Sequence, residues 1–315
     1  MGLDVNGVKL LLRAHYSGVA FTSVMMLGRQ SINIAPADRK RLGRSTPEGV
    51  PADRLLRALE SPYAEDLLAL LGAREIVSLD ASPYEQASLV HDMNKPIPDH
   101  LKGRFSLVLD GGTLEHVFNF PIAIQNCMEM TAVGGCCLII APTNNFTGHG
   151  FYQFSPELYF RVFSEPNGFR VEDMIVYGDG IAQSWYRVAD PNEVRARVLL
   201  MNGKPTYISV LAHRIAAAPM LIESPQQSDY VELWRHAEFP AATHRSHFIA
   251  LARAILPGWL RDSINHCIGR WRFGVNHRHY VRLKGPFDRV APGSIGRTNG
   301  SAYGAEASRT RLLSK

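Results

Sequence analysis

Short apolar runs that end at acidic or glycine residues recur along the first 215 residues of this chain. The run 105–109 ends at Asp110 and Gly111, and the run 136–141 ends at a proline. A stretch with helical character at 121–131 lies between them. Continuous apolar runs of this length are typical of strands buried on both faces of a parallel sheet. The alternation predicts a doubly wound α/β fold with functional groups at the carboxyl ends of its strands.

The same pattern places the remaining elements of this fold. Strands are expected at 21–27, 75–79, 88–90, 169–177 and 206–215, and helices at 7–15, 63–71, 155–163, 191–201 and 230–236. Gly134 and Gly135 are expected to break the chain before the fifth strand. The polar stretch 31–60 is too long for an ordinary turn and indicates an insertion, helical at 52–59. This insertion is either a lid over the carboxyl edge or a surface excursion without a role.

Composition and charge divide the chain into three parts. With 315 residues, 46% of them hydrophobic, it can bury a full core. We expect the α/β domain at 1–216, a basic helical extension at 217–284 and a disordered tail at 285–315. Residues 244–315 hold thirteen Lys and Arg against three Asp and Glu, whereas residues 1–243 hold 21 against 26. The acidic body is therefore not expected to bind nucleic acid.

The basic extension contains an amphipathic stretch at 246–271, which we expect to dock on the body or to lie on a membrane surface as a peripheral contact. No apolar run reaches the roughly 18 residues of a spanning helix. The first residues also lack the features of a signal peptide, so a cytoplasmic location is expected. The four cysteines, Cys127, Cys136, Cys137 and Cys267, lack metal-site spacing. We expect reduced, buried thiols, with the adjacent pair on opposite faces of a strand.

Several features of 105–160 together resemble the class I S-adenosylmethionine-dependent methyltransferases. They are a strand that ends in Asp, the segment GTLEHVFN, a Gly-Gly turn and a second strand that ends in proline, followed by GHGFYQFSPEL. The resemblance extends over about 21–215. It implies a seven-stranded, mostly parallel sheet with an antiparallel last strand, and S-adenosyl-L-methionine as cofactor. Neither G-x-G-x-x-G after the first strand nor G-x-S-x-G is present, which disfavours a dinucleotide oxidoreductase and an α/β-hydrolase.

The resemblance also implies which residues hold the cofactor. They are Gly28, Arg29, Gln30, Asp80, Asp92, Met93, Asp110 and Gly111. Of the family's glycine-rich loop only Gly28 remains, so Arg29 and Gln30 are assigned contacts in place of glycines. Asp80 would accept hydrogen bonds from the ribose hydroxyls, although Asp at a strand end is also a common turn former. Asp92 would face the adenine amino group and Met93 its ring, with a turn cap and a core methionine as the alternative.

The acceptor is expected beside the fourth and fifth strand ends. His149, between two glycines, is the first candidate for a catalytic base, followed by His116; Asp110 either takes part in catalysis or binds the cofactor. The candidates for holding the acceptor are Glu115, Asn144, Tyr152 and Gln153. Methyl transfer by in-line displacement needs no metal, and none is predicted. We expect a small-molecule or glycan-type acceptor. A non-catalytic scaffold protein with this fold is the alternative, because the glycine loop is degenerate.

Overall fold

The structure is a computed structural model that describes residues 2–46, 49–180, 184–236, 274–275 and 279–288. Its helices are α1 (Val5–Tyr16), α2 (Pro36–Arg44), α3 (Ala52–Ala58), α4 (Glu65–Leu70), α5 (Phe120–Met130), α6 (Pro156–Val162), α7 (Pro191–Val194) and α8 (Ser228–His236). Its strands are β1 (Gly2–Leu3), β2 (Ser23–Leu27), β3 (Ser31–Ile32), β4 (Glu75–Asp80), β5 (Leu89–Val90), β6 (Phe105–Gly111), β7 (Thr131–Asn144), β8 (Phe169–Gly178), β9 (Trp185–Val188), β10 (Thr206–Arg214) and β11 (Tyr280–Arg282).

The main sheet has the order β11-β9-β8-β10-β7-β6-β2-β4-β5 within the described part of the chain. Strands β5, β4, β2, β6 and β7 run parallel, so their carboxyl ends share one edge. Strand β10 runs antiparallel to both of its neighbours. The order reverses at β2, because the chain goes first to β4 on one side and later to β6 on the other. Such a reversal is where ligands bind in open α/β sheets.

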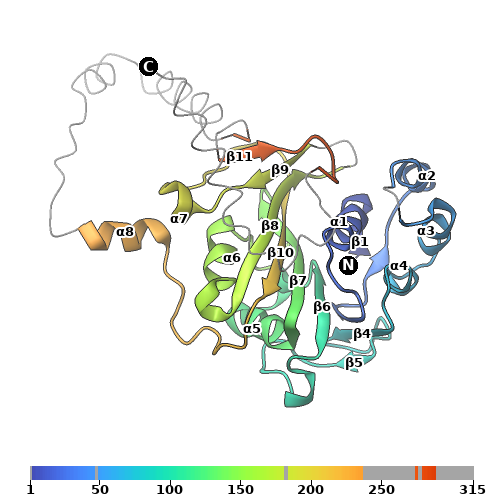
Figure 1. Ribbon diagram of the computed structural model, residues 1–315, viewed down its shortest axis with the longest axis horizontal. Coiled ribbons are helices and arrows are strands. Elements are labelled where there is room, and N and C mark those ends of the chain that lie inside the picture. The colour runs from blue at the N-terminus through green and yellow to red at the C-terminus, as the bar shows by residue number, and fades with distance from the viewer. Residues whose placement is uncertain (1, 47–48, 181–183, 237–273, 276–278, 289–315) are drawn as a thin grey trace, which may run out of the picture.

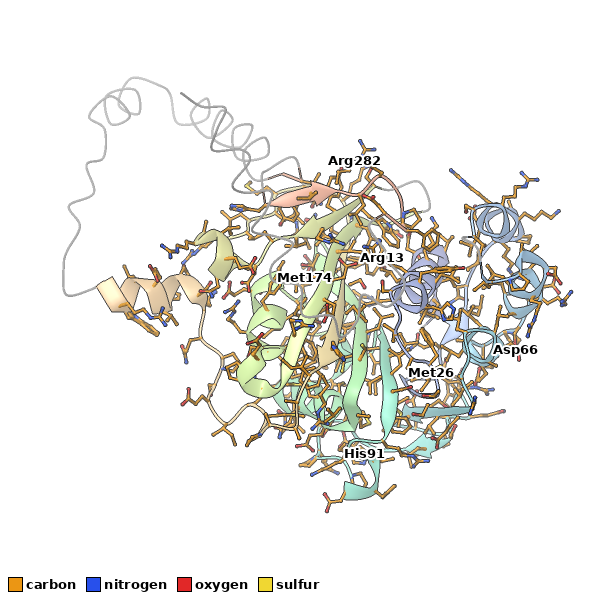
Figure 2. The ribbon with its side chains drawn as sticks, in the orientation of Figure 1. Arg13, Met26, Asp66, His91, Met174 and Arg282 are labelled. Atoms are coloured by element: carbon orange, nitrogen blue, oxygen red, sulfur yellow. The ribbon has the colours of Figure 1, made fainter. Side chains whose placement is uncertain are left out.

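Helices cover both faces of this sheet, with α1 to α4 on one side and α5 and α6 on the other (Figure 1). Alternate residues of each strand supply the two cores, because successive side chains point to opposite faces. In β2, Met25 packs with α5 and α6, whereas Met26 packs with α1 and α4. In β7, Cys137 packs in the first of these cores and Cys136 in the second. This confirms the prediction that the two thiols lie on opposite faces of their strand. Met26 and Met174 of β8, both labelled in Figure 2, are fully buried.

Most predicted elements are confirmed, and two differ. Gly134 and Gly135 do not break the chain, because they lie inside β7, where the pairing register with β6 shifts in a bulge. A Cβ at Gly135 would lie 2.9 Å from the Ser106 carbonyl oxygen, so the bulge needs a residue without a side chain. The helix predicted at 191–201 ends at Val194, since Arg195 adopts a left-handed conformation with φ of 49°.

The sheet is also wider than expected. It has nine strands within the described residues, whereas seven were predicted. Strand β9 extends it beyond β8, and β11 adds an edge from the region assigned to a helical extension. Residues 285–288, expected to be disordered, instead contact the body: the Pro286 and Asp288 carbonyls accept hydrogen bonds from Arg13. The amphipathic stretch 246–271, Cys267 and residues 289–315 lie outside the described residues.

The insertion after β2 is ordered around short elements. β3 pairs in parallel with β1, and α2 and α3 follow, the second close to the helix predicted at 52–59. Cys127, Cys136 and Cys137 are buried free thiols, as predicted. No helix in the described ranges is both long and apolar enough to cross a membrane.

Candidate functional site

The carboxyl ends of β2, β4 and β6 form the centre of the candidate site. Leu27, the last residue of β2, pairs with Leu79 on one side and with Asp110 on the other. Gly28 turns the chain away at φ of 68° and donates its N–H to the Leu79 carbonyl at 2.7 Å. The sheet register therefore brings Gly28, Asp80 and Asp110 to the point where the strand order reverses.

Gln30 fills the space beside this reversal point. Its side chain is fully buried, and its Nε2 donates to the Leu27 carbonyl at 2.6 Å. The Oε1 atom accepts no hydrogen bond from any described residue. A Cβ added at Gly111 would lie 2.4 Å from this Oε1, so the two residues are in close contact. Gln30 therefore presents an unpaired acceptor at the point where the strand order reverses.

Asp110 and Glu115 bury two carboxyl groups at the end of β6. Asp110 is 1% exposed, and its Oδ1 accepts the Thr113 N–H at 2.8 Å. Burial, and then the charge of Glu115, raises the pKa of Asp110 well above its ordinary value. Burial also raises the pKa of Glu115 to about 7. One oxygen of each carboxyl group has no hydrogen-bond donor among the described residues. Such groups are costly to bury and mark functional sites.

Tyr159 belongs to the same buried group but carries no signal in the sequence. It lies on α6, is fully buried, and its hydroxyl finds no partner in the described structure. Burial raises the pKa of Tyr159, and the charges of Asp110 and Glu115 add to this effect. We refer to Gln30, Asp110, Glu115 and Tyr159 as the strand-end cluster. Sequence reasoning missed Tyr159 because it reads as one more apolar position of an amphipathic helix.

Two loops join above this cluster. The Glu115 carbonyl accepts the Phe151 N–H at 2.8 Å and the Tyr152 N–H at 3.3 Å, and the Tyr152 hydroxyl donates to the Phe118 carbonyl at 2.7 Å. Gly150 makes this approach possible: its φ is 66°, and a Cβ there would lie 2.8 Å from the Glu115 carbonyl oxygen. The loop that follows β7 is therefore held against the turn that follows β6.

This contact brings Glu115, His116 and His149 together. His149 Nε2 lies 3.4 Å from Glu115 Oε1, and the two imidazole rings meet edge to face with centroids 4.9 Å apart. One ligand-type atom from each of the three residues lies within 4.8 Å of the others. The Glu115 side chain is 2% exposed, whereas that of His149 is 48% exposed. Burial, and then His149, lowers the pKa of His116. The group thus has a buried carboxylate and two imidazoles open to solvent.

Several predicted site residues are engaged in holding loops. Arg29 pairs with Glu65 at 2.7 Å and its guanidinium lies over the Tyr63 ring, which ties the β2 turn to the start of α4. Asn144 donates to Asn202 Oδ1 at 3.0 Å. The Gln153 side chain accepts the N–H of residue 146 at 2.7 Å and closes the loop that carries His149. These contacts orient the loops, and the predicted ligand contacts of these residues stay predictions.

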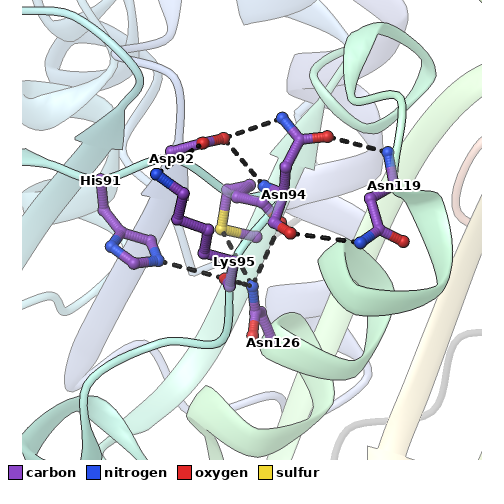
Figure 3. A network of polar contacts seen from close by, with 7 residues as sticks. His91, Asp92, Asn94, Lys95, Asn119 and Asn126 are labelled. Carbon is purple, nitrogen blue, oxygen red and sulfur yellow. Dashed lines mark hydrogen bonds and ion pairs between the residues drawn. The ribbon is translucent and has the colours of Figure 1, made fainter.

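The pair predicted at the adenine position lies in a local network (Figure 3). Asp92 Oδ1 accepts from the backbone and side-chain nitrogens of Asn94, at 3.0 and 2.8 Å, and these bonds hold the pKa of Asp92 below its ordinary value. Met93 is buried, with its sulfur 3.8 Å from Asn126 Nδ2. Asp80 is partly exposed, and its Oδ1 accepts the Ser82 N–H at 3.2 Å. In this arrangement Asp92 caps a turn and Met93 fills the core.

Comparisons with known proteins yield similar folds at low similarity. No family model matches the chain, and no curated protein matches it. Similar solved structures include a mutein of the branched-chain polyamine synthase from Thermus thermophilus in complex with N4-aminopropylspermidine and 5′-methylthioadenosine. It is 14% identical, with a TM-score of 0.36, over 71% of this chain and 58% of the synthase. The match thus spans less than two thirds of that protein.

Two further structures are methyltransferases by their descriptions. A putative methyltransferase from Bacillus halodurans is 9% identical, with a TM-score of 0.38, over 66% of this chain and 99% of its own. The 1,6-didemethyltoxoflavin-N1-methyltransferase from Burkholderia thailandensis, with bound 1,6-didemethyltoxoflavin and S-adenosylhomocysteine, is 14% identical, with a TM-score of 0.35. It is matched over 67% of this chain and 78% of its own. At these values the likenesses carry no argument about function.

Proposed function

We propose that this chain is an S-adenosylmethionine-dependent methyltransferase that acts on a small-molecule or glycan-type acceptor. The observation that carries the proposal is the pair of unpaired acceptors, Gln30 Oε1 and Asp110 Oδ2, buried where the strand order reverses. S-adenosylmethionine supplies a methyl group on a positively charged sulfur and carries an ammonium group as well. Buried acceptor atoms fit such a cation, because each would gain a charge-assisted partner.

We assign the remaining cofactor contacts as the resemblance to the methyltransferases implies. Asp80 lies at the end of β4, one strand from β2, where its carboxylate would hold the two ribose hydroxyls. Gly28 and Gly111 would leave the backbone accessible to the methionine part, with Gln30 Oε1 beside it. Asp92 and Met93 would border the adenine after a rearrangement of their turn. Asp110 would contribute a favourable charge near the sulfonium.

The acceptor would lie over the two joined loops, on the exposed side of His116 and His149. We propose that this group of two imidazoles and Glu115 accepts the proton that the acceptor group loses. Asn144, Tyr152 and Gln153 would keep the loops in place around the acceptor. The alignment of the acceptor with the methyl group and the exclusion of water would supply most of the rate enhancement.

A first experiment tests cofactor binding. Titration calorimetry of the full chain with S-adenosylmethionine and with S-adenosylhomocysteine should show binding of one equivalent at submillimolar concentration. If neither binds at millimolar concentration, the enzyme proposal fails. The alternative, a scaffold protein with this fold, would then be preferred, since a buried Gln30 already fills the place of the glycine loop.

A second experiment tests which residue contacts which part of the cofactor. Gln30→Ala should weaken binding of S-adenosylhomocysteine by about tenfold or more, as loss of a hydrogen bond to a charged group implies. The same variant should leave 5′-methylthioadenosine unaffected, because that compound lacks the amino-acid part. Asp80→Ala should weaken both ligands.

Asp66→Ala, on the exposed face of α4 in Figure 2, serves as the control for loss of an acidic side chain. It should change neither affinity. Equal losses for the two ligands in Gln30→Ala, with an unchanged thermal melting curve, would remove Gln30 from the methionine end of the site.

A further inference from the structure

We infer that Glu115, His116 and His149 form a binding site for one divalent transition-metal ion, such as Zn²⁺. The sequence does not reveal this site, because the second histidine is 33 residues from the first and no ligand spacing is recognisable. The fold brings them together by joining the turn after β6 to the loop after β7. The metal site does not depend on the proposed function; only its role toward the acceptor does.

The distances suit an ion held between the three side chains. Two atoms that each lie about 2.1 Å from a tetrahedral ion are about 3.4 Å apart. His149 Nε2 and Glu115 Oε1 are separated by 3.4 Å, so they could bind the same ion almost without moving. The most distant pair among the three ligand atoms lies within 4.8 Å. Side-chain rotation of exposed His116 can close this remaining gap.

Burial supplies a second, independent observation. The Glu115 side chain is 2% exposed, and its Oε2 has no hydrogen-bond donor in the described part of the chain. A buried carboxylate with one unpaired oxygen is costly, and a cation bound to the carboxylate would compensate its charge. The opposite side of the group is open, because both histidines are exposed. Three protein ligands with a free fourth position are typical of catalytic rather than structural metal sites.

The ligand types select the class of metal. Two imidazoles and one carboxylate are a common set for Zn²⁺ and for other first-row transition metals. Ca²⁺ and Mg²⁺ prefer oxygen ligands and, in the case of Mg²⁺, retain several waters. We therefore expect Zn²⁺ to bind and Mg²⁺ not to compete.

If the proposed function holds, the open position takes a hydroxyl oxygen of the acceptor. The ion would lower the pKa of that hydroxyl, whose proton passes to water. A lone pair on the oxygen then forms the bond to the methyl carbon, and the electron pair of the broken carbon–sulfur bond stays on sulfur. The residues Glu115, His116 and His149 thereby act through one ion instead of as separate bases.

The test is a titration of the full chain, without an affinity tag, with Zn²⁺ in the presence and absence of excess Mg²⁺. We expect one equivalent to bind with the same affinity in both conditions. Glu115→Gln and His149→Ala should each weaken binding at least tenfold, since even removal of an outer partner of a metal ligand costs this much. His100→Ala, on an exposed 3-10 turn away from the site, should bind like the original chain.

Two glycines offer a matched pair that leaves all three ligands in place. Gly150→Ala should weaken Zn²⁺ binding, because a Cβ there collides with the Glu115 backbone and a positive φ is strained. Gly148→Ala, two residues away, meets nothing within 4 Å and should bind normally. Thermal melting of each variant separates loss of the site from loss of the fold.

The outcomes distinguish the two proposals. Unchanged Zn²⁺ affinity in folded Glu115→Gln and His149→Ala overturns the metal site, whether or not the cofactor binds. Zn²⁺ binding that these variants abolish, in a chain that binds no S-adenosylhomocysteine, keeps the metal site and rejects the methyltransferase.

Discussion

Two groups of buried charges in this chain differ in how completely they are paired. At one end of the sheet, Asp173 of β8 accepts from Arg13 at 2.6 Å and from Arg187 at 2.9 Å, so both of its oxygens are paired. Arg13, labelled in Figure 2, also donates to the carbonyls of Pro286 and Asp288. In the strand-end cluster, every member instead keeps one polar atom without a partner among the described residues.

The difference separates a structural role from a functional one. A paired buried charge holds elements together, here α1, β8, β9 and the segment that follows β11. An unpaired buried group lowers the stability of the fold and persists only where it serves another purpose. Burial alone therefore does not identify a site, whereas several unsatisfied buried groups gathered at one strand end favour one. The predictions below test this contrast by removing or crowding members of either group.

The largest effect is expected from the paired group. Asp173→Asn would remove the carboxylate that pairs with both Arg13 and Arg187, whose side chains are only 5% and 17% exposed. Breaking a buried ion pair in this way costs about 3–5 kcal/mol. Urea unfolding should show this loss of unfolding free energy. A loss below about 1 kcal/mol would contradict the view that this group holds the elements together.

Crowding the strand-end cluster should have the next largest effect. Gly111→Ala places a Cβ 2.4 Å from Oε1 and 2.8 Å from Cδ of Gln30, which is fully buried and cannot easily move. Overpacking of this kind costs about 1–3 kcal/mol. The double variant Gln30→Ala/Gly111→Ala should recover most of that loss. A double variant with additive losses in urea unfolding would show that the two side chains do not compete for this space.

The sequence predicts the sheet well because its central strands are unambiguous. The run 136–141 is apolar at every position and 105–109 at every position but Ser106, which is typical of a strand covered on both faces. Strands β9 and β11 were missed because they are only four and three residues long, too short for a period to distinguish them from loops. Helix α7 ends early because Arg195 adopts a left-handed backbone conformation, which the helix propensity of arginine does not predict.

The site was harder to predict than the fold. Its residues at strand ends, Asp110 among them, follow from the strand pattern, but the degree of burial and the mutual effect on pKa depend on packing. The contact of His149 with Glu115 depends on how one glycine lets two loops approach, which is a tertiary property. Met93 shows the converse, since a methionine beside a strand end looks the same whether it contacts a ligand or fills the core.

Neutralising the unpaired carboxylate of Asp110 should raise the free energy of unfolding, by less than the losses expected above. Burial and Glu115 raise the pKa of Asp110, so the folded chain binds this proton more tightly than the unfolded chain. The contribution of Asp110 to stability is then fully present below its ordinary pKa of 3.8 and is lost as pH rises through the folded pKa. Asp110→Asn does not titrate, so its advantage over the original chain should grow from pH 5 to pH 8.

At pH 8 we expect the free energy of unfolding of Asp110→Asn to exceed that of the original chain by about 1 kcal/mol, because an unsatisfied buried charge costs about this much. The variant should also bind S-adenosylhomocysteine more weakly. Urea unfolding at the two pH values and calorimetry on the same samples provide the measurement. A variant that is less stable at pH 8 than at pH 5, relative to the original chain, would show that Asp110 is paired after all.

The smallest effect should come from an ion pair that is exposed. Asp53 and Arg57 of α3 are 2.7 Å apart, like the buried pairs, but their side chains are 65% and 67% exposed. Solvent screening leaves such pairs with little energy, so Asp53→Asn should leave the unfolding free energy unchanged within the error of urea unfolding. The comparison with Asp173→Asn holds the substitution constant and varies burial and the number of arginine partners. If both variants lost similar stability, the distance between charges, and not their desolvation, would decide what a buried charge contributes to this fold.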